Sequence, residues 1–128
     1  MAMRIGELAD RVGVSTRTLR HYESLGLLPG RRGSNGYRVY DDADVRAVRE
    51  IRMLVGLGFA LEETRPFVDC LRAGHERAGS CPDSLAVLRR KIAEVDESVD
   101  RLRRVRAELG DQLVEATHAR CEFSLFSP

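Results

Sequence analysis

The sequence feature that most constrains the fold is a long series of regularly spaced apolar residues in the C-terminal part of the chain. They occupy the a and d positions of a heptad repeat broken only at Arg106: Leu85, Leu88, Ile92, Val95, Val99, Leu102, Leu109, Leu113 and Ala116. The pattern predicts a helix over residues 85–116 with a coiled-coil seam. At about 1.5 Å per residue this helix would be about 50 Å long, which is more than a small domain can cover. We therefore expect a second copy of the chain to cover the seam, with the eight residues from Leu85 to Leu113 forming the dimer interface.

The rest of the chain has room for only one small globular domain, because the whole sequence has 128 residues. Charged residues make up 32% and aromatic residues 5% of the sequence, and tryptophan is absent. This composition requires aliphatic rather than aromatic packing, which favours a mainly helical fold.

Two short helices are predicted at the N-terminus. An apolar stripe of helical spacing runs from Ile5 to Val12, and Gly13 then provides a stop signal. Ser15 provides an N-cap for a second helix, so the turn between the helices spans only a few residues. This arrangement is typical of a helix-turn-helix.

The segment after these helices predicts a wing and two further helices. Residues 31–40, RRGSNGYRVY, place an Asn-Gly turn between basic and β-prone residues, which indicates a short hairpin. Asp41 can cap a third helix that ends at Gly56 and whose apolar face is Val45, Val48, Ile51, Leu54 and Val55. A fourth helix is predicted over residues 61–73, with a kink at Pro66 because an interior proline removes a backbone donor.

The basic charge is concentrated at the N-terminus, where residues 1–40 contain seven arginines and three acidic residues. Clustered cations favour a polyanion such as DNA, because binding releases counterions from the phosphates. The second helix exposes Thr16, Arg17 and Arg20, and the wing adds further arginines. An alternative remains open, in which the tyrosines are partly core and the arginines are only solvated. The candidate DNA-binding residues are Ser15, Thr16, Arg17, Arg20, His21, Tyr22, Arg31, Arg32, Tyr37, Arg38 and Tyr40.

Four segments resemble the MerR family of transcription regulators: RIGELADRVGVSTRTLRHYESLGLLPG, NGYRVYDDADV, IRMLVGLGFALEETR and the long helix that follows. The resemblance implies a homodimer joined by an antiparallel coiled coil, which binds a palindromic promoter site and controls transcription by RNA polymerase through distortion of the DNA. It matches Arg17, Arg20, His21 and Tyr22 to recognition-helix contacts, and Arg38 and Tyr40 to wing contacts. His21 departs from the tyrosine often found at its position.

The expected organisation is therefore a mainly α chain with three parts. Residues 1–74 form a winged helix-turn-helix domain with two accessory helices, residues 80–117 form the dimerisation coiled coil, and residues 118–128 form a tail that is a candidate effector loop. An architectural or interaction module without an effector response is the alternative function.

The cysteines suggest an effector site at the ends of the coiled coil. In an antiparallel pair, Cys81 of one chain lies near His118 and Cys121 of its partner, with Cys70 and His75 in reach. Thiolate and imidazole ligands bind Zn²⁺ or a similar soft ion. Two alternatives remain open: Cys81 as a reactive thiol at a helix start, or cysteines with no effector role. Three cysteines form an odd set, which argues against a disulfide scaffold in a reducing compartment.

Other classes of protein receive little support from the sequence. It contains no Ser/His/Asp set, no phosphate-binding glycine loop and no suitably spaced pair of acids, so we do not expect an enzyme. No apolar stretch approaches the roughly 18 residues of a membrane span, and MAMRIGELAD lacks the apolar region of an export signal. We therefore expect a cytoplasmic protein with no membrane partner.

Overall fold

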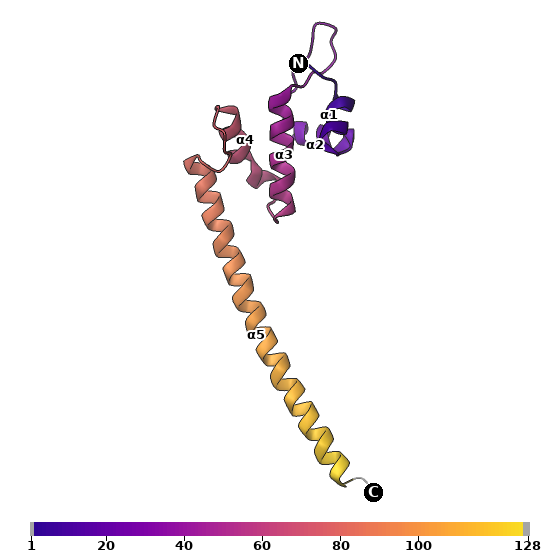
Figure 1. The fold of residues 1–128 in the computed structure, drawn as a ribbon, viewed down its shortest axis with the longest axis vertical. Helices are drawn as coiled ribbons and strands as arrows, with labels where there is room; N and C mark the ends of the chain where they lie inside the picture. Colours follow the sequence, from indigo (N-terminus) through magenta and orange to yellow (C-terminus); the bar gives the residue numbers. More distant parts are fainter. Residues whose placement is uncertain (1, 127–128) are drawn as a thin grey trace. The chain divides into compact units, whose positions relative to one another are not determined.

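The computed structural model describes the backbone of residues 2–126 and the side chains of residues 2–119. Its elements, shown in Figure 1, are α1 (Ile5–Val12), α2 (Thr16–Ser24), α3 (Asp42–Gly56), the 3-10 helix η1 (Leu61–Thr64), α4 (Arg65–Arg72) and α5 (Pro82–Phe126). Within the described residues, strand pairing is limited to the isolated bridges Met3–Tyr40 and Arg32–Arg38. The mainly helical fold is confirmed. The chain divides after Leu88 into two units.

The predicted helix-turn-helix is present at the N-terminus. Gly13 ends α1 in the left-handed conformation, with φ of 72°, and its backbone N–H donates to the carbonyl of Ala9. Such a backbone favours glycine because it has no Cβ. Ser15 caps α2 by accepting a hydrogen bond of 3.1 Å from the backbone N–H of Thr18. Both ends of the turn are thus encoded locally.

The wing is a short hairpin. Its tip turns at Gly36, where φ is 81°, and the backbone N–H of Gly33 donates to the carbonyl of Tyr37 over 2.7 Å. At its base, the backbone of Tyr40 exchanges hydrogen bonds of 2.7 and 2.8 Å with that of Met3. The start of the chain therefore holds the end of the wing.

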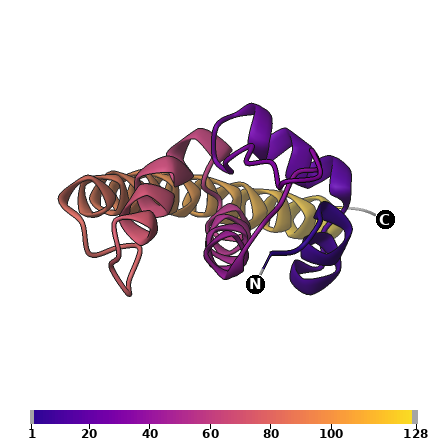
Figure 2. The same cartoon turned by 90° about the horizontal axis from the view of Figure 1, so that it is seen from above.

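Helix α3 is the central element of the first unit. Asp41 and Asp44 form a capping box at its start, as a cap at Asp41 predicted. In Figures 1 and 2, α1 and α2 lie on one side of α3 and α4 lies on the other. The prediction that Val55 faces the core is wrong, because this side chain is 42% exposed. Ala47, which is fully buried, completes the stripe instead.

The predicted fourth helix is two elements, η1 and α4. Pro66 lies in the first turn of α4, where its missing N–H removes no intrahelical hydrogen bond. The predicted kink is therefore wrong: the proline begins a new helix instead of bending an existing one.

Two apolar clusters stabilise the first unit. The larger cluster joins α1, α2 and α3 with the ends of the wing: Met3, Leu8, Ala9, Leu19, Tyr22, Leu27, Leu28, Tyr40, Val45, Ala47, Val48, Ile51 and Val68. The smaller cluster contains Leu54, Phe59, Phe67, Ala78 and Val87, with Leu71 and Leu88 packed against it. The first turns of α5 thus belong to the core of the first unit.

Helix α5 is longer than the predicted 85–116. It begins at Pro82 and continues through Phe126, so most of the expected C-terminal tail is helical. No glycine or proline interrupts residues 117–126, which leaves no local stop signal there. Of the eight predicted interface residues, seven are exposed in the single chain, while Leu88 is half-buried against the smaller cluster.

Candidate nucleic-acid interface

The outer face of α2 presents basic side chains to solvent. Arg17, Arg20 and His21 are exposed, and Thr16 is half-buried. The hydroxyl of Ser15 is already used, since it caps the helix and lies 3.0 Å from the hydroxyl of Thr18. Ser15 therefore positions the start of α2, and the free donors on this face come from the residues after it.

A basic cleft of about 320 Å³ joins α2 to the wing. It is lined by Arg4, Ile5, Arg20, Arg32, Tyr37 and Arg38, so four guanidinium groups and no carboxylate face it among the described residues. Arg4 was not among the sequence candidates. Its guanidinium carbon lies 4.2 Å from the ring centroid of Tyr37, a cation–π contact that ties the chain start to the wing tip. The sequence signal that could have identified Arg4 is its position as a basic residue directly before the first helix.

Two wing arginines are held in place by specific acceptors. Arg32 donates from Nη1 to the carbonyl oxygen of Gly36 over 2.7 Å, and Arg38 lies 3.0 Å from Oε1 of Glu23 on α2. These contacts restrict the side chains without covering them, because both residues remain exposed. The wing thus offers cations in a restricted geometry.

Tyr22 and Tyr40 are interior residues, with 6% and 1% of their surfaces exposed. The hydroxyl of Tyr40 donates to Oε2 of Glu23 over 3.1 Å. Burial, reinforced by the charge of Glu23, raises the pKa of Tyr40 to about 12. Burial also raises the pKa of Tyr22, against a smaller opposing effect of Arg52. Both side chains therefore pack in the core, and their contact with DNA stays a prediction.

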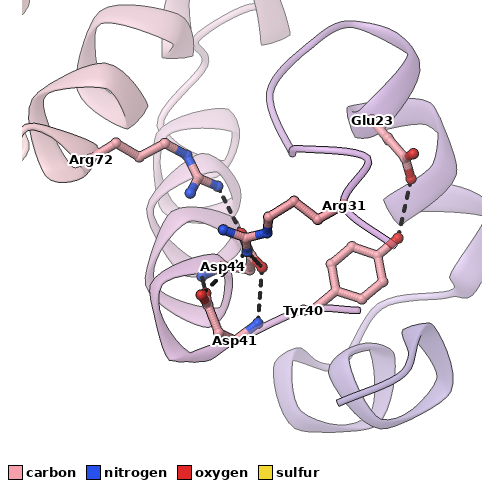
Figure 3. Close-up of polar contacts among 6 residues, drawn as sticks. All are labelled: Glu23, Arg31, Tyr40, Asp41, Asp44 and Arg72. Carbon is pink, nitrogen blue, oxygen red and sulfur yellow. Dashed lines mark hydrogen bonds and ion pairs between the residues drawn. The ribbon is translucent and has the colours of Figure 1, made fainter. Parts of the chain in front are cut away.

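A buried carboxylate anchors the base of the wing (Figure 3). Asp44 on α3 is fully buried and accepts hydrogen bonds from Arg31 Nη2 at 2.7 Å, Arg72 Nη2 at 2.9 Å and the Asp41 backbone N–H at 2.9 Å. Arg31 also lies 3.3 Å from the carboxylate of Asp41. Burial acts to raise the pKa of Asp41, but the hydrogen bond from the Asp44 backbone and the charge of Arg31 lower it overall. The side chain of Arg31, a predicted DNA contact, thus pairs with acids at the start of α3 and helps to connect the wing with α3 and α4.

The cysteines form a disulfide that the sequence did not predict. Cys70 of α4 and Cys81, which directly precedes α5, form a disulfide with a Cα–Cα distance of 5.9 Å, so the expectation of no disulfide is wrong. His75 lies with them, and the ligand atoms of the three residues are within 4.8 Å of one another. His118 lies in α5, and the side chain of Cys121 is outside the described part of the chain. The predicted group of Cys81, His118 and Cys121 therefore stays a prediction.

Two family models match the chain. The MerR helix-turn-helix regulatory family matches residues 3–69, which contain α1, α2, the wing and α3. The MerR DNA-binding family matches residues 45–112, which contain η1, α4 and much of α5. The chain belongs to the MerR family of regulatory proteins. It is a DNA-binding transcription regulator with a winged helix-turn-helix and a long C-terminal helix.

Individual MerR-family proteins agree with this assignment. The transcriptional regulator HmrR of Rhizobium leguminosarum bv. viciae is 37% identical over 91% of this chain and 87% of its own length. The structure of PbrR691 from Ralstonia metallidurans CH34 with lead(II) is 35% identical, with a TM-score of 0.68 over 85% of this chain and 83% of that chain. HiNmlR, solved bound to promoter DNA, is 28% identical, with a TM-score of 0.52 over 78% and 80% of the two chains.

The family assignment gives no indication of catalytic activity. Within the described residues, no helix combines the length and the apolar character that a membrane span requires.

Proposed function

We propose that this chain binds a palindromic promoter site as a homodimer, with α2 in the major groove and the wing on the flanking backbone. The basic cleft is the observation that carries the proposal, because it gathers Arg4, Arg20, Arg32 and Arg38 from three segments of the chain. Guanidinium groups neutralise phosphates and can read guanine edges. Helix-turn-helix proteins place the N-terminal part of the second helix in the groove, which here contains Arg17.

The proposed DNA contacts differ from the first expectation. We retain Thr16, Arg17, Arg20 and His21 on α2, and we add Arg4 to Arg32, Tyr37 and Arg38 near the wing. Tyr22, Tyr40, Arg31 and Ser15 act instead by holding these residues in position. This division separates the groups that reach DNA from those that fix the geometry.

The exposed seam of α5 supports the homodimer. Seven predicted interface residues leave between 37% and 68% of their surface open in the single chain: Leu85, Ile92, Val95, Val99, Leu102, Leu109 and Leu113. An apolar row of this length favours association, because pairing of the helices removes its apolar surface from water. An antiparallel coiled coil between two copies covers this row. Leu88 contributes mainly within its own chain.

We propose that regulation acts through the shape of promoter DNA. A dimer holding two winged helix-turn-helix units can bend or untwist the DNA between them and so control its use by RNA polymerase. The promoter-bound HiNmlR structure supports a promoter as the target. Such a role places the protein in the cytoplasm.

The structure of the relative PbrR691 in complex with lead(II) supports a soft metal ion as the effector. We propose that a thiolate-bound ion such as Zn²⁺ acts on this protein. The ligand set predicted from the sequence is Cys81 with the partner's His118 and the partner's Cys121.

Arg20→Ala tests the proposed DNA contact. A DNA site selected from a random pool by the wild-type protein is titrated by fluorescence anisotropy at several salt concentrations. We expect at least a tenfold loss of affinity and a shallower salt dependence, because one phosphate or base contact is removed. Arg101→Ala, an exposed arginine of α5, is the matched control and should bind within twofold of wild type. Wild-type affinity of Arg20→Ala would refute the placement of α2 in the groove, as would failure to select any preferred site.

A further inference from the structure

The geometry points to a single-chain site for a soft divalent cation of the Zn²⁺ class, formed by Cys70, His75 and Cys81. The three residues come from the end of α4, the following loop and the start of α5, and all belong to the first unit. Their ligand atoms lie within 4.8 Å of one another. This site needs no second chain, unlike the set predicted from the sequence, and the two sets share Cys81.

The separations match the needs of such an ion. With Zn–S bonds of about 2.3 Å, two sulfurs on one tetrahedral ion lie about 3.8 Å apart. The backbones of Cys70 and Cys81 are already close enough, with a Cα–Cα distance of 5.9 Å, so the thiols can separate by side-chain rotation alone. His75 adds an imidazole nitrogen of the same ligand class. Two thiolates and one imidazole leave a fourth position open.

A cleft of about 390 Å³ gives access to the two sulfurs. Cys70 and Cys81 both line it, together with Asp69, Asp83 and Arg65. The guanidinium of Arg65 donates to the carbonyls of Leu25 and Gly26, which leaves two carboxylates against one paired cation. Carboxylates attract a cation and can also occupy a fourth coordination position. The site therefore has an entry path of suitable charge.

The start of α5 favours a thiolate at Cys81 once the disulfide is reduced. The sulfur of Cys70 lies 3.7 Å from the hydroxyl of Ser80, which donates its proton to the carbonyl of Arg77 over 2.8 Å. Cys81 accepts the first helical hydrogen bond of α5 from the backbone N–H of Leu85, so its side chain lies at the positive end of the helix dipole. The start of α5 thus stabilises negative charge at Cys81.

The site is also connected to the wing. Arg72 follows Cys70 by two residues on α4, and its guanidinium reaches Asp44, which holds Arg31 at the base of the wing. A cation that fixes the end of α4 can therefore influence the DNA-binding surface. This regulatory consequence rests on the proposed function, whereas the binding of the ion does not.

The experiment begins by opening the disulfide in the purified full-length chain. A water-soluble phosphine transfers two electrons to the sulfurs, two protons from the solvent complete the thiols, and the phosphine takes oxygen from water to become its oxide. The phosphine is removed without air, and Co²⁺ is titrated as a spectroscopic probe. We expect one tetrahedral cobalt ion per chain, with sulfur-to-metal charge-transfer bands that Zn²⁺ abolishes. The unreduced protein should show no such bands.

Three variants separate the two ligand sets. Cys70→Ser and His75→Ala should each weaken Co²⁺ binding at least tenfold, whereas Cys121→Ser should bind as wild type. His75 is exposed, so its variant retains the packing if Cys70→Ser does not fold. The proposal is overturned if the reduced wild type binds no Co²⁺. It is equally overturned if Cys121→Ser loses the ion while His75→Ala keeps it, which would support the two-chain set. DNA affinity is measured on the same samples, so loss of DNA binding with cobalt still bound would contradict only the proposed function.

Discussion

Replacement of Asp44 by Asn should substantially destabilise the first unit, because this carboxylate joins three segments. Its oxygens accept from Arg31, Arg72 and the backbone of Asp41, and the residue is fully buried. Asparagine has nearly the same shape and keeps one acceptor oxygen. Its NH₂ group, however, replaces a carboxylate oxygen beside an arginine, so a donor then faces a donor.

The magnitude follows from the exposure of the partners. A hydrogen bond to a charged group contributes about 1.5–3 kcal/mol. The side chains of Arg31 and Arg72 are 47% and 29% exposed, so solvent reduces each lost ion pair to about 1 kcal/mol. The new unsatisfied NH₂ group adds about 1 kcal/mol. The total loss is about 3 kcal/mol, which corresponds to a decrease in Tm of roughly 12–24 °C for a unit of this size.

Urea denaturation followed by circular dichroism at a fixed protein concentration measures this loss. Asp42→Asn is the matched control, because Asp42 lies two residues before Asp44 in the same helix and makes one exposed ion pair of 3.1 Å with Arg11. That variant should lose less than about 0.5 kcal/mol. If Asp44→Asn is as stable as Asp42→Asn, the buried network does not hold the wing to α3 and α4, and the reasoning is refuted.

Three further predictions concern the core, the seam and the turn. Burial raises the pKa of Tyr40 to about 12, above its ordinary value. The stabilisation from its neutral phenol should therefore be complete below pH 10 and fall between pH 10 and 12. Urea midpoints measured across this range should show the fall in the wild type and a smaller one in Tyr40→Phe. Leu102→Glu places a charge on a seam residue that is 63% exposed in the single chain. Sedimentation should show a monomer at concentrations where the wild type is a dimer. An unchanged dimer would exclude this seam as the interface. Gly13→Ala should lower the free energy of unfolding by about 1 kcal/mol, because φ is 72° at this residue. Gly6→Ala, inside α1, should be neutral or stabilising. Equal thermal shifts for the two variants would contradict this reasoning.

Features that depend on adjacent residues were predictable from the sequence. The end of α1 at Gly13 and the caps at Ser15 and Asp41 agree with the structure, because each cap satisfies backbone groups within three or four residues of itself. Pro66 was misread because a proline is equally compatible with a kink and with a new helix start. Only the preceding 3-10 turn distinguishes these two outcomes.

The candidate site was predictable only in part. Arg20, Arg32 and Arg38 were expected near DNA, and the structure gathers them in one cleft. Arg4 was missed, because its position before α1 is only a weak signal and its place at the cleft depends on contact with the wing tip. Arg31 and Arg32 are neighbours of the same residue type, yet Arg31 donates to Asp44 whereas Arg32 lines the cleft. The residue type shows that a side chain is cationic, but only the fold determines which groups that side chain contacts.

The sequence by itself determined α1, α2 and α3 with their caps, the basic N-terminal segment and the apolar row of α5, since each depends on local periodicity and composition. The tertiary structure alone decided which tyrosines are buried, which acid holds the wing, and that Cys70 pairs with Cys81. These contacts join residues that are distant in the chain or separated by a loop, and their formation depends on how α3, α4 and the start of α5 pack. No local pattern encodes that packing, because it is the outcome of burying all the apolar faces of the first unit at once.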